Sequence, residues 1–68
     1  MATFKIEFSY LLEGTRKRDC DLFDDDTLMG AVHQAEQFYS TLTTGLRIER
    51  IYMEVPSQWI EMSTDFLD

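Results

Sequence analysis

Five aspartates lie within eight residues of this chain, in the segment DCDLFDDD at positions 19–26. They are Asp19, Asp21, Asp24, Asp25 and Asp26. Carboxylates at this density could bind a divalent cation, support the start of a helix, keep the chain soluble or meet a basic partner. The spacing does not fit a calcium loop of the EF-hand type, because Phe23 and Asp24 occupy the positions that require an Asp or Asn and a Gly. We therefore expect no specific metal site here.

The remaining chemistry-bearing residues are few. Cys20 is the only cysteine and His33 the only histidine, which excludes an internal disulfide and leaves no cluster for zinc. We expect Cys20 on the core face of a strand and His33 on the polar side of a helix, neither with a catalytic partner. The chain contains no P-loop and no GxGxxG motif, and no pair of carboxylates is singled out by its spacing. The sequence predicts a non-enzymatic protein without a cofactor.

The distribution of charge indicates the kind of partner. The net charge is −7, and residues 19–46 contain five Asp and Glu36 but no Lys or Arg. Affinity for nucleic acid or anionic lipid comes mainly from Lys and Arg, so direct binding to either is disfavoured. A basic protein is the natural complement. The N-terminal residues MATFKIEF lack the pattern of a signal peptide, and a single cysteine fits a reducing compartment, so we expect a cytoplasmic protein.

The elements that position these residues begin with a hairpin. Apolar side chains at every second position from Phe4 to Leu12 predict a half-buried strand over residues 3–12. The segment TRKRDCDLF, residues 15–23, is expected to return as a second strand through a turn at Glu13-Gly14.

The faces of these two strands decide the length of the turn. A two-residue loop would place Asp19 and Asp21 on the core face, which would bury carboxylates. We therefore predict a three-residue loop, residues 12–14, with Gly14 in the left-handed conformation. The register that follows pairs Phe4 with Leu22, Ile6 with Cys20 and Lys5 with Asp21.

A helix follows the hairpin, because the apolar period changes to 3.6 residues. The apolar stripe consists of Leu28, Ala31, Val32, Ala35, Phe38, Tyr39 and Leu42. His33, Gln34, Glu36 and Gln37 form its polar side, and Gly45 is a plausible stop signal. One aspartate among residues 24–26 is expected to cap this helix, while its neighbours favour the positive end of the helix dipole.

Two further strands complete the predicted α+β domain. Residues 46–55 change their apolar parity, which predicts a bulge near Glu49-Arg50. A turn at Pro56-Ser57 leads to a fourth strand, QWIEMS, and residues 64–68 form a tail that can fray. The expected fold is a single domain over residues 1–68 with element order β-β-α-β-β. Its four-stranded antiparallel sheet has strand order 2-1-3-4, with the helix on one face.

The fourth strand raises the question of which way Trp59 points. If Ile60 and Met62 face the core, Trp59 and Glu61 lie on the helix-free face near Tyr52, but a pattern this short leaves the opposite parity open. Exposed Trp and Tyr are favoured anchors of protein interfaces. The candidate partner-binding residues are therefore Asp19, Asp21, Asp24, Asp25, Asp26, Tyr52, Glu54, Trp59 and Glu61.

These observations support two hypotheses of function. The first is an inhibitor that occupies a basic, nucleic-acid-binding surface of a partner protein, using a ridge of carboxylates about 6.6 Å apart along the second strand. The alternative is a self-associating scaffold module that uses the helix-free face around Tyr52 and Trp59, with acidity serving only solubility. A homodimer, or a small regulatory subunit or enzyme whose site a partner completes, is also open.

The size, acidity and single α+β unit resemble, in a general way, small inhibitors carried by phages and mobile elements, including anti-CRISPR and anti-restriction proteins. The resemblance includes no sequence motif, so it assigns no role to any residue.

Overall fold

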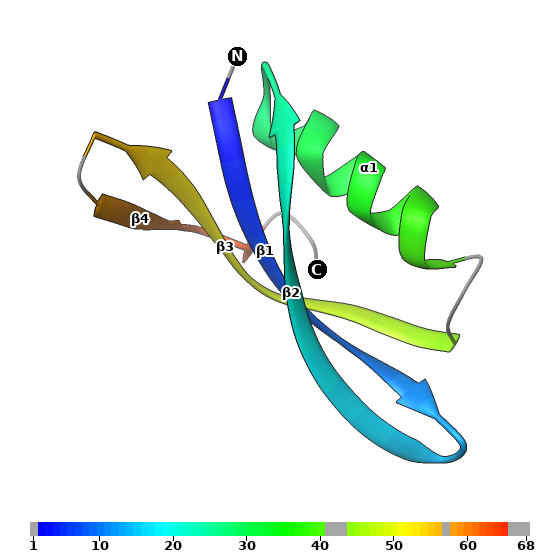
Figure 1. The fold of residues 1–68 in the computed structure, drawn as a ribbon. Helices are drawn as coiled ribbons and strands as arrows, with labels where there is room; N and C mark the ends of the chain where they lie inside the picture. The colour runs from blue at the N-terminus through cyan, green and yellow to red at the C-terminus, as the bar shows by residue number, and fades with distance from the viewer. Residues whose placement is uncertain (1, 41–43, 57, 66–68) are drawn as a thin grey trace.

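The computed structural model describes residues 2–40, 44–56 and 58–65 (Figure 1). Its elements are β1 (Ala2–Leu12), β2 (Thr15–Asp25), α1 (Leu28–Ser40), β3 (Thr44–Val55) and β4 (Gln58–Met62). The strands form one antiparallel sheet in the order β2-β1-β3-β4, and α1 packs on one face, which confirms the predicted α+β fold. Within the described ranges, the helix falls short of the length and hydrophobicity that crossing a lipid bilayer requires.

The core lies between α1 and the central strand β1. Phe4, Ile6 and Phe8 of β1 are at most 3% exposed, which confirms their predicted facing. They pack against Ala31, Val32 and Ala35 of α1 and Ile51 of β3. Small residues on the helix stripe allow α1 to lie close to the sheet. Phe38, at the edge of the stripe, is 57% exposed, and Leu42 lies outside the described residues.

The predicted bulge in β3 is confirmed. Glu7 pairs with Arg50 and Phe8 pairs with Ile48, so Glu49 is the extra residue between them. The bulge reverses the parity of the strand, so that both Ile48 and the buried Ile51 pack against the core.

The predicted three-residue turn between β1 and β2 is wrong. Leu12 pairs with Thr15, which leaves a two-residue turn of Glu13 and Gly14, with φ of 53° and 81°. Positive φ at both central residues is the geometry of a type I′ turn, whose twist matches that of the flanking strands. The true register sets Phe4 against Phe23, Lys5 against Leu22, Ile6 against Asp21 and Phe8 against Asp19.

This register changes the facing of every residue of β2. Asp19 and Asp21 lie on the helix side of the sheet, yet both are exposed because β2 is an edge strand. The premise that this face would bury them was therefore wrong. Cys20, predicted to face the core, lies on the opposite side and is exposed.

The helix is capped by Thr27 and not by one of the aspartates 24–26, so the predicted cap is wrong. The Thr27 hydroxyl accepts a hydrogen bond from the Gly30 N–H at 3.0 Å, and the Thr27 carbonyl accepts one from the Ala31 N–H at 3.2 Å. Thr27 is therefore the N-cap. Gly45, expected as a stop signal, lies inside β3 with φ of 62°. The predicted turn at Pro56-Ser57 and the tail at 64–68 fall partly outside the described residues.

Candidate binding surfaces

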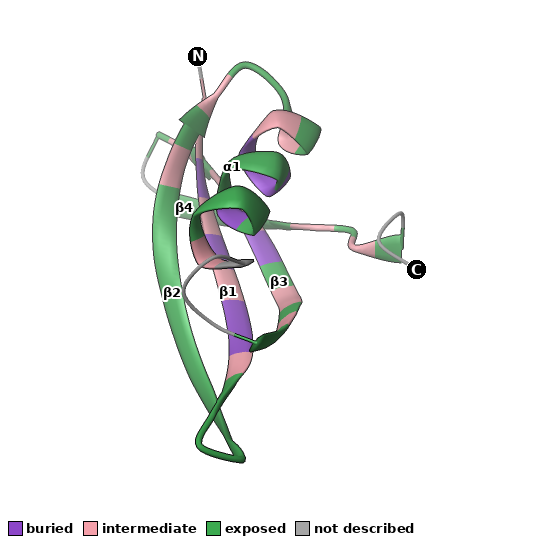
Figure 2. Ribbon diagram, turned by 90° about the vertical axis from the view of Figure 1, so that its right-hand side faces the viewer, coloured by how far each residue is buried: buried purple, intermediate pink, exposed green. Residues whose placement is uncertain are grey.

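The acidic half of β2 forms a largely exposed strip along the edge of the sheet (Figure 2), in which Asp25 is half-buried. We use the name acidic strip for Asp19, Asp21, Asp24 and Asp25. Asp19, Asp21 and Asp25 alternate along β2 and share the helix side, whereas Asp24 pairs with Thr3 and lies on the helix-free side. Asp26 lies in the turn before α1. The acidic strip is therefore presented along the edge rather than on one flat face.

Hydrogen bonds orient the carboxylates of Asp19 and Asp21. Asp19 Oδ1 accepts from the Cys20 N–H at 2.8 Å, and Asp21 Oδ1 accepts from the Leu22 N–H at 2.8 Å. Asp21 Oδ2 also accepts from the Tyr39 hydroxyl at 2.6 Å. The outward-facing N–H groups of an edge strand lack a strand partner, so these two side chains satisfy donors that would otherwise meet only water.

Tyr39 joins the end of α1 to the acidic strip. Its ring centroid lies 4.2 Å from that of Phe8 and 6.4 Å from that of Phe23. Burial, followed by the hydrogen bond to Asp21 and the charges of Asp21 and Asp19, raises the pKa of the Tyr39 hydroxyl. The hydroxyl therefore keeps its proton and donates to Asp21 throughout the neutral pH range.

Asp24 and Asp25 are held by residues on both sides of the sheet. Asp24 accepts a hydrogen bond from the Thr3 hydroxyl at 2.6 Å. Asp25 accepts from the Thr27 N–H at 3.0 Å and from the Gln34 amide at 2.9 Å. These bonds, led by that from the Thr27 backbone, lower the pKa of Asp25. Asp25 therefore supports the entry into α1 indirectly, by orienting the N-cap.

The second group of candidate residues lies on the helix-free face at the opposite edge. Glu54 pairs with Trp59 and Tyr52 pairs with Glu61, which places these side chains together. Of the two facings that the sequence left open for Trp59, the structure has the one that points away from α1, because Ile60 pairs with Met53, which packs on the core. Trp59 is 37% exposed.

Lys5 completes this aromatic group and was missed by the sequence analysis. Its Nζ lies 4.9 Å from the centroid of the Tyr52 ring and 5.1 Å from that of Trp59, within cation–π range of both. The missing information was the register, since Lys5 pairs with Tyr52 of β3 and Leu22 of β2.

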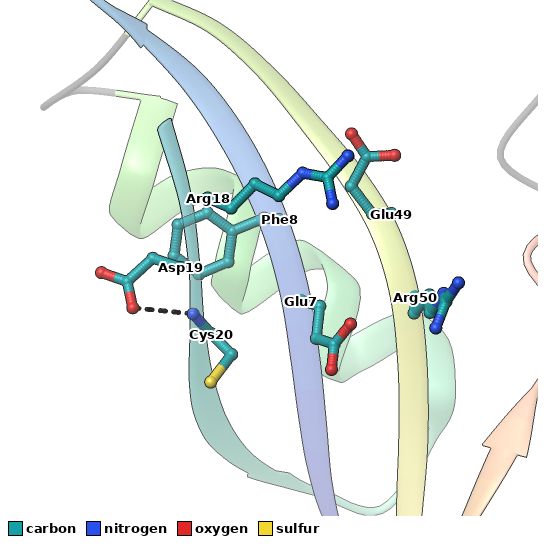
Figure 3. A pocket seen from close by; sticks show the side chains of 7 residues that line it. All are labelled: Glu7, Phe8, Arg18, Asp19, Cys20, Glu49 and Arg50. Atoms are coloured by element: carbon teal, nitrogen blue, oxygen red, sulfur yellow. Dashed lines mark hydrogen bonds between the residues drawn. The ribbon is translucent and has the colours of Figure 1, made fainter. Parts of the chain in front are cut away.

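Charges on the helix-free face compensate one another. The hydroxyl of Tyr52 and the carboxylates of Glu61 and Glu7 raise the pKa of the Arg50 guanidinium. A hollow of about 410 Å³ lies beside Arg50, and Arg18 extends from β2 across β1 toward Glu49 (Figure 3). The hollow is lined by Glu7, Phe8, Arg18, Asp19, Cys20, Glu49 and Arg50. Because positive and negative side chains line the hollow together, it does not favour a ligand of either charge.

Next to this hollow, a polar network holds the bulge of β3. Ser9 is 0% exposed, although the sequence pattern placed it on the solvent side. Its hydroxyl donates to Glu49 Oε1 at 2.8 Å and accepts from Arg16 Nη1 at 2.7 Å. Arg16 also donates to the Gly45 carbonyl at 3.2 Å. The charged side chains of this network therefore serve the fold rather than forming a free site.

Eight of the nine candidate residues thus divide between two surfaces, and the ninth, Asp26, lies in the turn before α1. The acidic strip lies at the β2 edge, and the group formed by Tyr52, Glu54, Trp59 and Glu61 lies at the β3–β4 side, with β1 between them. The described residues bring no three carboxylate, thiol or imidazole groups together in a way that could hold a metal ion. No family model matches this chain, and neither a curated protein nor a solved structure is significantly similar to it.

Proposed function

We propose that this protein is a non-enzymatic binding module whose acidic strip docks on a basic surface of a partner protein. The observation that carries the proposal is the character of the hydrogen-bond donors to the strip. They are backbone N–H groups, hydroxyls and one side-chain amide, all of them neutral. The carboxylates are thereby oriented while their negative charge remains available to a partner.

Orientation matters because a preorganised side chain loses less conformational freedom on binding than a mobile one. A fixed row of negative charge also steers a basic partner toward the edge and speeds its association. A basic groove that normally holds nucleic acid has the complementary charge. Mimicry is partial, because same-face residues of a strand are about 6.6 Å apart whereas duplex DNA carries one charge per about 1.7 Å. The activity that follows is inhibition by occupying such a groove.

The test starts with identification of the partner. Tagged parent protein and the variant Asp19→Asn with Asp21→Asn serve as baits in extracts of the native host, followed by mass spectrometry. A matched control, Glu54→Gln with Glu61→Gln, removes two charges from the other edge. We expect the parent and the control to capture nucleic-acid-binding proteins that added duplex DNA displaces, and the Asp19 and Asp21 variant to lose them. Equal capture by all three baits, or capture that DNA does not displace, would overturn the proposal.

A second candidate function is self-association through the helix-free face. The partial exposure of Trp59 beside Tyr52 favours it, since both are typical interface anchors. Lys5 already lies over both rings, so a second copy would have to enclose this cation. Protection of Trp59 fluorescence from acrylamide as the protein concentration rises would support this function, and quenching independent of concentration would exclude it.

A further inference from the structure

Strand β2 has an open outer edge. It is the terminal strand of the sheet, and its residues from Thr15 to Leu22 are all exposed (Figure 2). In an antiparallel pair, alternate residues turn their N–H and C=O groups toward the partner strand or away from it. Leu12 and Thr15 close the hairpin, so the even-numbered residues of β2 direct these groups outward. The side chains of Asp19 and Asp21 accept hydrogen bonds from the Cys20 and Leu22 N–H groups, which agrees with this assignment.

The charges along this edge are arranged in two blocks of opposite sign. The first half of β2 contains Arg16, Lys17 and Arg18, and the second half contains Asp19, Asp21, Asp24 and Asp25. An antiparallel copy of the same strand would place each basic block beside an acidic one. We propose that two copies of this chain associate through their β2 edges, as antiparallel strands, to form one continuous sheet. The proposal does not depend on the function proposed above.

The geometry also restricts the register, and charge favours one allowed register over its neighbour. Outward-facing residues must pair with outward-facing residues, so even-numbered positions lie opposite even-numbered positions. When Cys20 lies opposite Leu22 of the second copy, Arg18 lies opposite Asp24 and Lys17 opposite Asp25. The neighbouring register, with Cys20 opposite itself, sets Asp19 against Asp21 twice and is disfavoured by like charge. Arg18 extends over β1 in the single chain (Figure 3), and the proposed pairing requires this side chain to turn toward the edge.

The carboxylates of Asp19 and Asp21 make this association reversible. In the single chain they hold the N–H groups of Cys20 and Leu22, and pairing replaces these bonds by bonds to carbonyl groups of the second copy. In the favoured register Asp21 lies opposite its own equivalent, so its charge weakens the pair. Asp21→Asn removes this charge and keeps an acceptor for Tyr39, so it should tighten the association.

Sedimentation equilibrium over a range of protein concentrations, at one ionic strength, tests the proposal by a charge exchange. We expect the parent to form a species of twice the mass of the chain, with Arg18→Asp and Asp24→Arg each raising its dissociation constant about tenfold. The variant with both substitutions restores opposite charges across the edge and should recover the parent value. Glu36→Arg, which makes the same change of charge on the exposed side of α1, is the control and should leave the constant unchanged.

The single cysteine provides an independent distance measurement. A nitroxide attached to Cys20 of the parent should show dipolar broadening at concentrations where the pair forms and lose it in Arg18→Asp, because the two labels approach across the edge. A parent that stays monomeric at every concentration would overturn the proposal. So would a dimer that the charge exchange does not weaken and restore, or one without broadening of the label.

Discussion

Both edges of the sheet contain carboxylates, but the groups around these carboxylates differ in charge. At β2, the donors that Asp19 and Asp21 have among the described residues are all neutral. On the β3–β4 side, Arg50 lies in the field of Glu61 and Glu7, and Lys5 covers the rings of Tyr52 and Trp59. The carboxylates of Asp19 and Asp21 are therefore oriented by neutral groups, whereas those of Glu61 and Glu7 have a cationic neighbour in Arg50. The comparison teaches that the donor to a carboxylate, more than the number of carboxylates, decides whether a surface is available to a partner.

The largest expected effect concerns the packing that supports the β2 edge. Phe8 is 1% exposed and its ring contacts that of Tyr39, which holds Asp21. Phe8→Ala should destabilise the domain by about 3–5 kcal/mol, enough to unfold much of it. Glu36→Ala, on the exposed side of α1, should change stability by less than about 0.5 kcal/mol. Urea denaturation of both variants checks this, and similar midpoints would show that the assigned core is wrong.

A smaller effect tests how firmly Asp25 is held. Gly→Ala in a helix normally stabilises by about 1 kcal/mol. At Gly30, however, an added Cβ would overlap the Asp25 carboxylate, which hydrogen bonds to Thr27 and Gln34 keep in place. Gly30→Ala should therefore destabilise by about 1 kcal/mol. In an Asp25→Ala background the same change should stabilise, and a stabilising effect in both backgrounds would show that Asp25 moves freely.

The lowered pKa of Asp25 predicts a dependence of stability on pH. A group whose pKa is lower in the folded state stabilises the fold above its unfolded pKa, and this stabilisation is lost as the pH falls through the folded pKa. Stability should therefore decline below about pH 4 in the parent, and less steeply in Asp25→Asn. Thermal melts between pH 2.5 and pH 7 measure both slopes, with Asp26→Asn as the comparison. Parallel curves for parent and Asp25→Asn would contradict the assignment.

The smallest effect concerns the β3–β4 side. Lys5→Ala removes the cation from the rings of Tyr52 and Trp59 and should reduce stability by no more than about 1 kcal/mol. Acrylamide should quench Trp59 fluorescence more strongly in this variant, because the lysine stem no longer shields the ring. Unchanged quenching would indicate that Lys5 does not cover Trp59 in solution.

The comparison also shows which features a sequence of this kind makes predictable. Periodicity was sufficient for all five elements, and the parity change in the third strand correctly indicated the bulge at Glu49. Strand order followed from placing the most apolar strand at the centre. These features depend on which residues are buried, and the apolar pattern of the sequence indicates those residues.

The register of the hairpin was not predictable by the same reasoning. The predicted register required the face of β2 beside the helix to be buried throughout, whereas its aspartates lie at an edge of the sheet. Positive φ at Glu13 also makes possible a two-residue turn that the residue type alone disfavours. The prediction of the N-cap was also wrong, because several adjacent Asp and Thr residues are all suitable caps. The position of Lys5 over two rings depends on the registers of β3 with β1 and β4, for which the sequence made no prediction.

The most direct test of the central claim compares the two edges with the same partner. Binding of the protein most strongly captured by the parent would be measured at low and high salt for the parent, for Asp19→Asn with Asp21→Asn, and for Glu54→Gln with Glu61→Gln. Loss of the Asp19 and Asp21 charges should weaken binding about tenfold at low salt, mainly through slower association, and flatten its salt dependence. Loss of the Glu54 and Glu61 charges should change neither, with melting temperatures of all three proteins nearly equal. Equal affinities and equal salt slopes for the two variants would contradict the distinction between the edges.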